Sequence, residues 1–564
     1  MSRVDTVTPI LPPLRSDELL GRQWDEYCEV LVLGWGAAGA CAALEARAAG
    51  AYVLVADRFL GGGASAKSGG VVYAGGGTRQ QRRAGYNDSP EAMFDYLRHE
   101  TQGVVSDATL RRFCDDSVAN LQWLESHGAP YSHEVPPGGK TSYPQDGYYL
   151  YYSGNELVPL YAGDNPPAPR GHRTVGKGQC GAVLYRHLQA ACLRAGVRPL
   201  LQAAARRLVV DAVGRVIGAE FWRLPPGSQQ AGLHARLIAR AEKLQNFAPG
   251  YCDGLRQRAA QLEKDFARPL LVRASKAVIL STGGFIFNRE LIARHAPKFR
   301  RNFKVGATGC DGSGLRLGLS VGASSDRLER VSAWRFINPP YSWHKGIVVN
   351  TEGRRFCNEE VYGATLGQPL MEEQGGRAWL VLDKPLRRKA LREALFKGYW
   401  WFQTVPALAL MLFNVRKGRS LDELARVTGM NAQALRDAVQ ANNAAARGEA
   451  ADPFGKSRGG RQALEQGPYY ACDISVGNPL FPLGALTLGG LRVDEGNGAV
   501  LDETAQPVPG LYAAGRAAVG IPSHLYISGL SLADCVFSGR RAGLAAARDG
   551  QGSHQPQCAD EAAS

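Results

Sequence analysis

A glycine-rich turn near the start of the chain constrains the fold more than any other feature. It follows a short apolar run at 30–33, has the spacing Gly34-x-Gly36-x-x-Gly39, and precedes an alanine-rich stretch at 40–49. Gly34 permits a tight turn, Gly36 lets backbone approach a pyrophosphate, and Gly39 lets a helix pack closely on a strand. This order of strand, turn and helix predicts a nucleotide-binding βαβ unit, whose helix N-terminus faces the phosphates.

A second apolar run at 51–56 follows and ends in an acidic residue, Asp57, 23 positions after Gly34. A carboxylate at this place can accept hydrogen bonds from ribose hydroxyls. Two further glycine-rich stretches lie at 61–70 and 75–77. Such a composition disfavours a packed helix or strand, so it predicts a loop. Because the loop comes so soon after the βαβ unit, we expect it to lie against the bound nucleotide.

Similar turns return far along the chain and indicate one domain built from both chain ends. An apolar run at 276–281 enters a Gly-Gly turn, and another ends at Gly515, before a helix predicted over 532–547. A polar, amphipathic stretch at about 221–270 predicts a helical insertion. We therefore predict an α/β fold, in which a discontinuous Rossmann-like domain carries an inserted α+β catalytic or cap domain. The predicted parts are an N-terminal tail (1–27), the two parts of the nucleotide-binding domain (28–300 and 481–550), the inserted domain (301–480) and a C-terminal tail (551–564).

Composition supports a globular chain and excludes several classes. Glycine makes up 68 of 564 residues without a Gly-X-Y repeat, which excludes collagen, and 45% hydrophobic residues argue against disorder. The net charge of +14 would suit an anionic partner. However, the basic residues are dispersed apart from short clusters at 82–83 and 387–389, and no nucleic-acid-binding motif accompanies them. We interpret the charge as a solvated surface and expect no nucleic-acid partner.

The cysteines and the N-terminus bear on the compartment. Eleven cysteines occur without a C-x-x-C pair or a Cys/His metal spacing. An odd number in a long chain fits reduced thiols better than a disulfide framework. Residues 1–24 contain no apolar run typical of a signal peptide. These features predict a cytoplasmic protein without a bound metal.

One uncharged segment at 398–415 allows two interpretations. It contains four consecutive aromatic residues and a later apolar run, but Gln403, Thr404 and Pro406 interrupt it, and a membrane span needs about 20 apolar residues. The first interpretation is a buried helix of the cap domain. The second is an interfacial patch or substrate entrance that makes peripheral membrane contact, because its flanks are basic and its start is rich in Trp and Tyr.

From about Cys28 to Leu544 the chain resembles the FAD-dependent family that includes flavoprotein fumarate reductases and 3-ketosteroid dehydrogenases. The acid after the second strand is Asp57 where this family more often has Glu, and either residue can hold a ribose. The motifs that carry the resemblance are Gly34-x-Gly36-x-x-Gly39, Asp57, the 61–70 loop, Thr282-Gly283-Gly284, Gly309-x-Asp311-Gly312, Arg355-Phe-x-Asn358-Glu359, Gly489-Gly490 and Pro509-Gly-Leu-Tyr-Ala-Ala-Gly515.

The resemblance implies FAD as the cofactor. The positions that it assigns to cofactor binding fall in the glycine turns, at the end of the second strand and at the start of the last helix. They are Gly34, Gly36, Ala37, Ala38, Gly39, Asp57, Arg58, Gly63, Ala64, Ser65, Ser68, Gly69, Gly70, Thr282, Gly283, Gly284, Asp311, Gly515, Gly529, Ser531 and Leu532.

The resemblance also separates branches of the family by reaction. Fumarate reductases usually present Thr-His-Gly-Gly, but here Leu488 stands in the histidine position. The Δ4-(5α) ketosteroid branch carries Tyr-x-Ser before the last helix, and this chain is similar there, with Tyr526 and Ser528. That branch also has a tyrosine after the Asn-Glu motif, where this chain has Tyr362. The Δ1 branch instead carries Tyr-x-x-x-Gly, and this chain has Leu530 in place of that glycine. We therefore expect a 3-ketosteroid substrate and a C4–C5 double bond in the product.

The resemblance implies a role for each of these residues, and the chemistry of the reaction fits these roles. We expect the Tyr526 hydroxyl to donate to the steroid C3 oxygen, Ser528 to act as the base at C4, and Tyr362 to relay the proton to solvent. Tyr341 is an alternative relay and His524 an alternative base. Δ1-dehydrogenation and reduction of an unsaturated acid of the fumarate type stay open as alternative functions. The electron acceptor is not identified.

Overall fold

The computed structural model describes residues 5–19, 22–163 and 165–549. Its central sheet contains five parallel strands in the order β21-β10-β2-β3-β7. The strands are β2 (Glu26–Leu33), β3 (Val53–Asp57), β7 (Arg198–Leu201), β10 (Arg268–Leu280) and β21 (Pro507–Ala513). Strands from both chain ends therefore pair with β10, which confirms the predicted discontinuous α/β domain.

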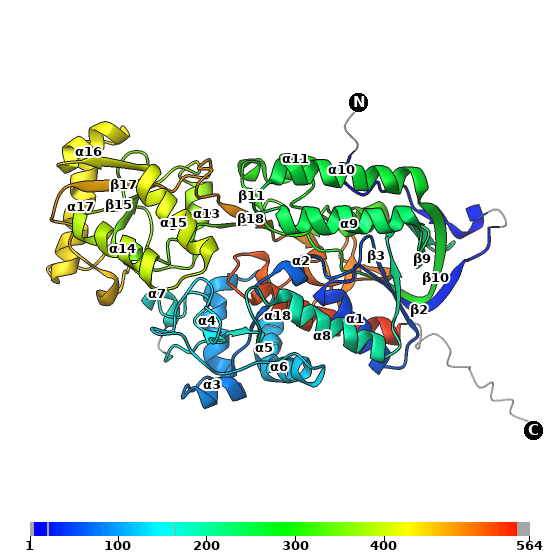
Figure 1. Cartoon of the computed structure of the whole chain (residues 1–564). Helices are drawn as coiled ribbons and strands as arrows, with labels where there is room; N and C mark the ends of the chain where they lie inside the picture. Colours follow the sequence, from blue (N-terminus) through cyan, green and yellow to red (C-terminus); the bar gives the residue numbers. More distant parts are fainter. Residues whose placement is uncertain (1–4, 20–21, 164, 550–564) are drawn as a thin grey trace, which may run out of the picture.

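Helices α1 (Ala37–Ala48), α8 (Gly181–Arg194) and α18 (Leu530–Arg548) lie together beside this sheet (Figure 1). Helices α1 and α18 can approach closely because small residues line their contact. A Cβ atom built on Gly543 would lie 2.2 Å from the Ala42 carbonyl oxygen. The last helix thus packs directly on the first one, although about 490 residues separate them along the chain.

An antiparallel meander extends the same sheet through β8 (Ala203–Val210), β9 (Val216–Arg223) and the first half of β10. Between β9 and β10 the chain forms two helices, α9 (Gln229–Leu244) and α10 (Pro249–Phe266), that pack side by side along one edge of the molecule (Figure 1). We call this pair the helical hairpin. It lies within the stretch where the sequence predicts a helical insertion.

The residues predicted as an N-terminal tail pack on the domain where the structure describes them. Strand β1 (Leu14–Arg15) pairs with β8, and Thr8 is buried, with its hydroxyl donating to Asp311 Oδ2 at 2.6 Å. The strand and the buried threonine make this segment part of the fold, a feature that its irregular sequence does not predict. The predicted C-terminal tail (551–564) lies outside the described residues.

The glycine-rich stretch at 61–70 differs from the predicted loop. Residues Gly63–Lys67 form a short helix, α2, because Ala64, Ser65 and Ala66 after the glycines have ordinary helical propensity. The glycines themselves make the turn into it, with φ of 85° at Gly61 and 86° at Gly62. A three-stranded sheet follows, in the order β4 (Val71–Tyr73), β6 (Gly171–Arg173) and β5 (Leu150–Tyr151).

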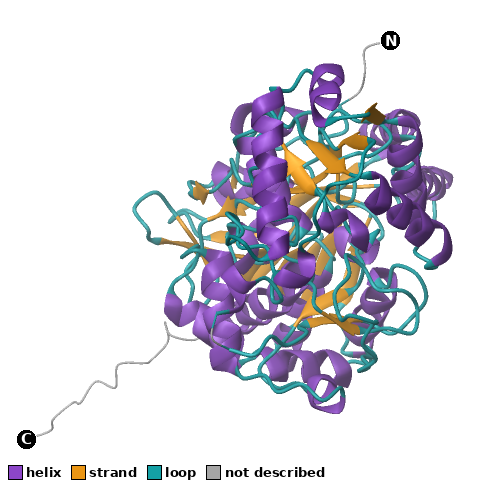
Figure 2. Ribbon diagram, turned by 90° about the vertical axis from the view of Figure 1, so that its left-hand side faces the viewer, coloured by secondary structure: helices purple, strands orange, loops and turns teal. Residues whose placement is uncertain are grey.

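The middle of the chain forms the inserted domain around an antiparallel sheet. Its strand order is β14 (Ile347–Val349), β15 (Trp379–Leu382), β17 (Tyr469–Asp473) and β16 (Val415–Gly418). Figure 2, viewed from the side of this domain, shows helices surrounding short strands. The helices are α13 (Gly363–Glu372), α14 (Lys384–Phe396), α15 (Trp401–Phe413), α16 (Leu421–Thr428) and α17 (Ala432–Arg447).

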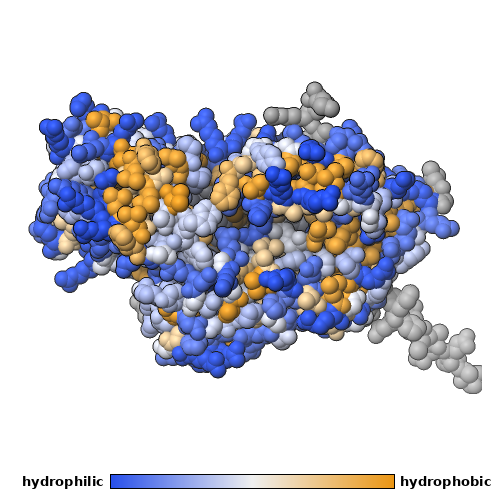
Figure 3. Space-filling view, viewed as in Figure 1, coloured by the Kyte–Doolittle hydropathy of each residue, from blue (hydrophilic) through white to orange (hydrophobic). Residues whose placement is uncertain are grey.

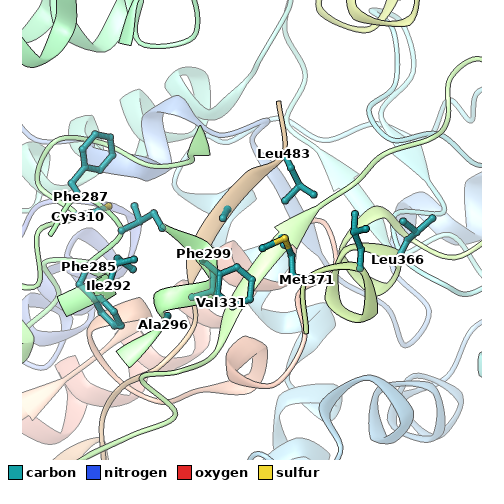
Figure 4. Packing of buried hydrophobic residues seen from close by; sticks show 14 of the residues in the cluster. Phe285, Phe287, Ile292, Ala296, Phe299, Cys310, Val331, Leu366, Met371 and Leu483 are labelled. Carbon is teal, nitrogen blue, oxygen red and sulfur yellow. The ribbon is translucent and has the colours of Figure 1, made fainter. Parts of the chain in front are cut away.

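One hydrophobic cluster runs from the nucleotide-binding domain into the inserted domain. Figure 4 shows part of it, with Phe285 at one side, Phe299 and Met371 in the middle and Leu366 at the other side. The sheet β11-β18-β13 lies between them, and its strands are β11 (Phe303–Lys304), β18 (Gly484–Thr487) and β13 (Val331–Trp334). The shared core fixes the inserted domain beside the ends of the parallel strands.

Further α-helices and strands complete the described part of the chain. They are α3 (Arg79–Arg83), α4 (Pro90–Thr101), α5 (Asp107–Asp115), α6 (Ser117–Ser126), α7 (Pro159–Ala162), α11 (Arg289–His295), α12 (Ser313–Ser320), β12 (Ser325–Asp326), β19 (Gly490–Leu491) and β20 (Ala499–Leu501).

Candidate active site

A long cavity opens at the carboxyl ends of β2 and β3, the place where open α/β sheets bind ligands. The predicted cofactor residues that line it come from the first glycine turn, the end of β3, helix α2 and the two later turns. They are Gly34, Gly36, Ala37, Ala38, Asp57, Arg58, Gly63, Ala64, Ser65, Thr282, Gly283 and Asp311.

The first glycine turn has the form that a pyrophosphate cradle needs. Gly34 has φ of 99°, and a Cβ there would lie 2.7 Å from the Ser281 carbonyl oxygen, so no other residue fits without a shift. A Cβ on Gly36 would meet nothing closer than 3.4 Å, because this position faces the cavity. Gly39 lies outside the cavity wall, and its Cβ would lie 2.0 Å from the Gly34 carbonyl oxygen. The three glycines thus serve the turn, the ligand approach and the helix packing separately.

Asp57 lies at the end of β3 on the cavity wall. Its Oδ2 accepts from the Trp35 backbone N–H at 2.9 Å, and its Oδ1 accepts from the Phe59 N–H at 2.7 Å. Burial raises the pKa of Asp57, and these backbone hydrogen bonds oppose that rise. A carboxylate offers about four acceptor sites, more than these backbone bonds use, so the residue remains able to accept from a ribose hydroxyl.

Arg58 and Asp311 line the cavity but bind each other. Arg58 Nη1 lies 3.0 Å from Asp311 Oδ2, and its Nη2 lies 3.0 Å from Glu263 Oε2. The remaining Asp311 oxygen accepts from the Ser313 N–H at 3.0 Å. Both side chains therefore have their charges compensated within the protein, and we propose that they shape the cofactor site rather than bind the cofactor through their charge.

The other predicted cofactor residues are not part of this cavity wall. Gly70 packs against Cys180, and a Cβ on Gly284 would lie 2.3 Å from Thr487 Oγ1. Gly529 is the N-cap of α18 and approaches the Tyr73 backbone. The full set outside the wall is Gly39, Ser68, Gly69, Gly70, Gly284, Gly515, Gly529, Ser531 and Leu532.

Arg516 is a cavity residue that sequence reasoning missed. It lines the wall, and its Nη1 is buried without a hydrogen-bond partner among the described residues. Its Nη2 contacts Cys310 Sγ at 3.6 Å, but a buried N–H without an acceptor is costly unless a ligand supplies one. The polar oxygens of FAD fit this donor, as the glycine cradle fits its pyrophosphate. The sequence did contain a signal for Arg516: it directly follows Gly515, the last residue of a motif assigned to the cofactor.

The predicted catalytic tyrosines meet in an aromatic cluster between the two domains. Tyr526, in the loop before α18, stacks on Trp334 with ring centroids 5.2 Å apart and lies 6.4 Å from Tyr362. Tyr362, the N-cap of α13, packs edge to face on Phe336 at 5.2 Å. The two phenols come from different domains, so their meeting depends on how the inserted domain docks.

Ser528 lies between these phenols and a third one. Its Oγ is 3.2 Å from the Tyr151 hydroxyl, and it lies close enough to Tyr362 to oppose the rise in the pKa of that phenol. Its backbone is fixed by Ser153, which accepts from the Ser528 N–H at 3.3 Å and donates its hydroxyl to the Ser528 carbonyl at 3.0 Å. Tyr151, on strand β5, is a further site residue that the sequence motifs did not indicate.

The alternative residues lie in other surroundings. The Tyr341 ring packs on Tyr399 at 5.9 Å, apart from the contacts that join Tyr526, Tyr362 and Ser528. His524 is half-buried, and burial, reinforced by Arg330, lowers its pKa to about 4. A histidine with this pKa is a weak base at neutral pH. The geometry thus favours Tyr362 and Ser528 over Tyr341 and His524.

Burial sets the protonation state of the phenols. It raises the pKa of Tyr526 to about 12, although a hydrogen bond from the Gly529 backbone opposes the rise. Burial also raises the pKa of Tyr362 well above its usual value, and the neighbouring Tyr526 adds to this shift. At neutral pH both hydroxyls are therefore protonated, and each can donate a hydrogen bond.

The buried carboxyl of Glu100 is linked to the Tyr362 backbone through Asn155. The Tyr362 backbone N–H donates to Asn155 Oδ1 at 2.6 Å, and the Asn155 amide donates to Glu100 Oε1 at 2.7 Å. The same oxygen of Glu100 accepts from the Tyr96 hydroxyl at 2.6 Å. Burial raises the pKa of Glu100 to about 7, against opposing hydrogen bonds from Tyr96 and Asn155.

The free energy of unfolding of a Glu100→Gln variant, compared with that of wild type, should increase as the pH rises. The folded pKa of about 7 exceeds the ordinary value of 4.5, so folded wild-type protein holds more protons between these values and loses stability as the pH increases through them. The Glu100→Gln variant lacks this loss, so its free energy of unfolding should gain about 3 kcal/mol relative to wild type from pH 4.5 to pH 7.5. Denaturant unfolding at several pH values, with the exposed Glu290→Gln as control, measures this; a pH-independent difference would contradict it.

Comparison with known proteins assigns the chain to a family of flavoproteins. The family described as FAD binding domain matches residues 29–529, so the chain belongs to this family and binds FAD. A 3-oxo-5-alpha-steroid 4-dehydrogenase of Comamonas testosteroni is 47% identical over 91% of this chain and 97% of its own length. A 3-oxosteroid 1-dehydrogenase of Mycobacterium tuberculosis is 28% identical over 88% of this chain and 94% of its own length.

A solved structure agrees with this assignment. The 3-ketosteroid-Δ4-(5α)-dehydrogenase of Rhodococcus jostii RHA1, determined in complex with 4-androstene-3,17-dione, superposes with a TM-score of 0.79. It is 28% identical, and the match covers 95% of this chain and 100% of that one. The predicted family, fold class and cofactor are therefore confirmed.

Proposed function

We propose that this chain is an FAD-dependent oxidoreductase that dehydrogenates 3-oxo-5α-steroids and introduces a C4–C5 double bond. The observation that carries the proposal is that Tyr526, Ser528 and Tyr362 come together in an aromatic, largely buried setting. Such walls suit an uncharged polycyclic ketone. The near relative and the superposable structure act on substrates of this class by name.

The reaction removes a proton from C4 and a hydride from C5. FAD, held by the glycine turns, Asp57 and Arg516, supplies the hydride acceptor when bound. The protein must therefore stabilise negative charge on the C3 oxygen and take the C4 proton. The first task falls to Tyr526, whose raised pKa keeps its hydroxyl protonated and able to donate to that oxygen.

Ser528 takes the proton from C4. A serine hydroxyl is a weak base unless a neighbour receives its proton; here the Tyr151 hydroxyl contacts its Oγ, and Tyr362 is the second phenol nearby. As Ser528 accepts from C4, its own proton passes to a phenol oxygen, and the phenol releases its proton onward. The Tyr362 side chain is buried, so a relay through it needs a further group, such as a bound water, before reaching bulk solvent.

Product analysis tests this function. Purified enzyme is incubated with a 5α-3-ketosteroid and an artificial electron acceptor, and the new alkene is located by NMR. The proposal predicts a double bond between C4 and C5. Exclusive formation of the C1–C2 alkene would replace it with the Δ1 reaction, and turnover of fumarate-like acids with reduced dye but no steroid turnover would replace it with carboxylate reduction.

We further propose peripheral membrane contact through the end of α14 and one face of α15. Helix α15 runs unbroken through Pro406, and it buries Ala407, Leu410 and Met411 while exposing its opposite face. The exposed apolar residues, here called the α15 patch, are Leu395, Phe396, Trp401, Val405, Leu412 and Phe413. Figure 3 shows an apolar area over this part of the molecule.

The surroundings of the α15 patch fit an anionic lipid surface. Exposed basic side chains flank it at Arg388, Lys389, Arg392, Lys397, Arg416 and Lys417, and each can contribute about 1 kcal/mol near such a surface. Trp400, expected in the contact, instead donates its indole N–H to the Pro144 carbonyl at 3.0 Å. Among the described residues no helix has the length and apolarity to cross a bilayer, so the proposed contact lies on the surface.

Charging the α15 patch should weaken vesicle binding. Phe396 and Phe413 are 80% and 79% exposed, so the double variant Phe396→Glu/Phe413→Glu should fold normally yet bind anionic vesicles at least about tenfold more weakly. Val213→Glu, at a remote position that is 84% exposed, is the matched control. Vesicle flotation measures the partitioning, and equal flotation of both variants would remove the proposal.

A further inference from the structure

The helical hairpin supplies one wall of the cofactor cavity. Helix α9 runs beside the end of β3 (Figure 1), and the side of it that faces the cavity presents both apolar and polar groups. These residues recur at helical spacing, and they are His234, Ala235, Ile238, Ala239 and Glu242. Neither the glycine motifs nor the family resemblance assigns this stretch a role.

One side of the hairpin is fastened next to Asp57. Glu263, on α10, is buried and pairs with Arg58, the residue that follows Asp57, at 3.0 Å. The other Glu263 oxygen lies 3.0 Å from His234 Nε2. The His234 ring also stacks on Phe59, with ring centroids 5.8 Å apart and an angle of 10° between planes. Because Asp57 marks the ribose end of the cavity, these contacts place α9 against the adenosine part of the site.

A second fastening point lies further along α9. The Glu242 carboxylate pairs with Lys67 of helix α2, and its Oε1 accepts from the Thr308 backbone N–H at 2.7 Å. Thr308 Oγ1 in turn accepts from Arg256 Nε of α10 at 3.0 Å. One carboxylate thus joins the hairpin to two segments, α2 and the loop at 305–312, that are far apart in sequence.

We propose that the helical hairpin completes the FAD site and retains the adenosine half of the cofactor. The hairpin is fastened at Arg58, Lys67 and Thr308, so its wall of the cavity stays in place unless these bonds break. We expect the flavin half to lie toward Arg516 and Cys535, which also line the cavity and are not part of the hairpin. Loosening the hairpin therefore acts on how long FAD stays bound, through contacts that the reacting hydroxyls do not share.

The release rate of FAD from the loaded enzyme tests this. Holoenzyme is diluted into cofactor-free buffer, and the return of free flavin fluorescence is followed. Glu242→Gln removes the charge that pairs with Lys67 and should speed release at least about tenfold, the effect expected of a charge-assisted hydrogen bond. Lys67→Gln should act similarly, and the double variant should release FAD little faster than either single one, because all three lose the same pair.

Asp265→Asn is the matched control, since it removes a hairpin carboxylate whose hydrogen-bond partner is Gln261 on the same helix. Ile238→Ala, which removes apolar wall without changing charge, should also speed release. Wild-type release from both Glu242→Gln and Ile238→Ala would overturn the proposal. Equal acceleration by Asp265→Asn would overturn it too, because the effect would then come from hairpin charge rather than from the fastening contacts.

Discussion

Replacing Ser528 with alanine should lower kcat by about 10²- to 10⁴-fold, the range typical of losing a positioned proton-transfer group. The reason is geometric: Ser528 Oγ contacts the Tyr151 hydroxyl and has Tyr362 nearby, and alanine removes the atom that would link a substrate proton to these phenols. The backbone bonds to Ser153 do not need the side chain, so the loop should keep its shape. Steady-state kinetics, with FAD occupancy read from the protein-to-flavin absorbance ratio, measures the loss.

Ser126→Ala serves as the matched control, since that exposed hydroxyl only donates to a carbonyl three residues earlier in its own helix. A Ser528→Ala enzyme with near-wild-type kcat would remove Ser528 from the proposed role. Loss of flavin from this variant would also count against the account, because it would show that Ser528 supports the cofactor site instead.

Replacing Tyr526 with phenylalanine should lower kcat by about 10²- to 10³-fold, as removal of one oxyanion donor commonly does. Phenylalanine keeps the ring that stacks on Trp334, and so keeps the aromatic wall, but it loses the hydroxyl proposed to donate to the C3 oxygen. Substrate affinity should therefore change less than kcat. Single-turnover reduction of the bound flavin by a 5α-3-ketosteroid separates the two quantities.

Tyr341→Phe provides the comparison for this variant, because Tyr341 packs on Tyr399 outside the hydroxyl cluster. We expect nearly unchanged flavin reduction from it. If Tyr341→Phe were as slow as Tyr526→Phe, or if Tyr526→Phe reduced its flavin at the wild-type rate, the assignment of the C3 donor would be wrong.

The glycine-turn part of the cavity wall could be predicted from local sequence. The glycine turn acts within a few residues, and its physical requirements, a positive φ at Gly34 and a close approach at Gly39, leave a direct mark on residue choice. The prediction was incomplete at Arg58 and Asp311, whose charges pair with each other. Sequence spacing places both beside the cavity, but it cannot reveal that they neutralise one another.

The substrate half depended on contacts between distant segments. Tyr151 reaches Ser528 across 377 positions, and Tyr362 reaches Tyr526 only because the inserted domain shares a core with the other domain. The resemblance supplied Tyr362, Tyr526 and Ser528, whereas nothing in the sequence around Tyr151 distinguishes it from a packed aromatic residue. The fastening of the helical hairpin escaped prediction for the same reason: its ion pairs join α9 and α10 to remote segments.

The central claim concerns which two hydrogens leave the substrate, and isotope effects on anaerobic flavin reduction test it most directly. Oxidised holoenzyme is mixed with a 5α-3-ketosteroid deuterated at C4 and C5, and separately with one deuterated at C1 and C2. The account predicts slower bleaching of the flavin with the first substrate and an unchanged rate with the second. Slowing by the C1 and C2 label alone would contradict it.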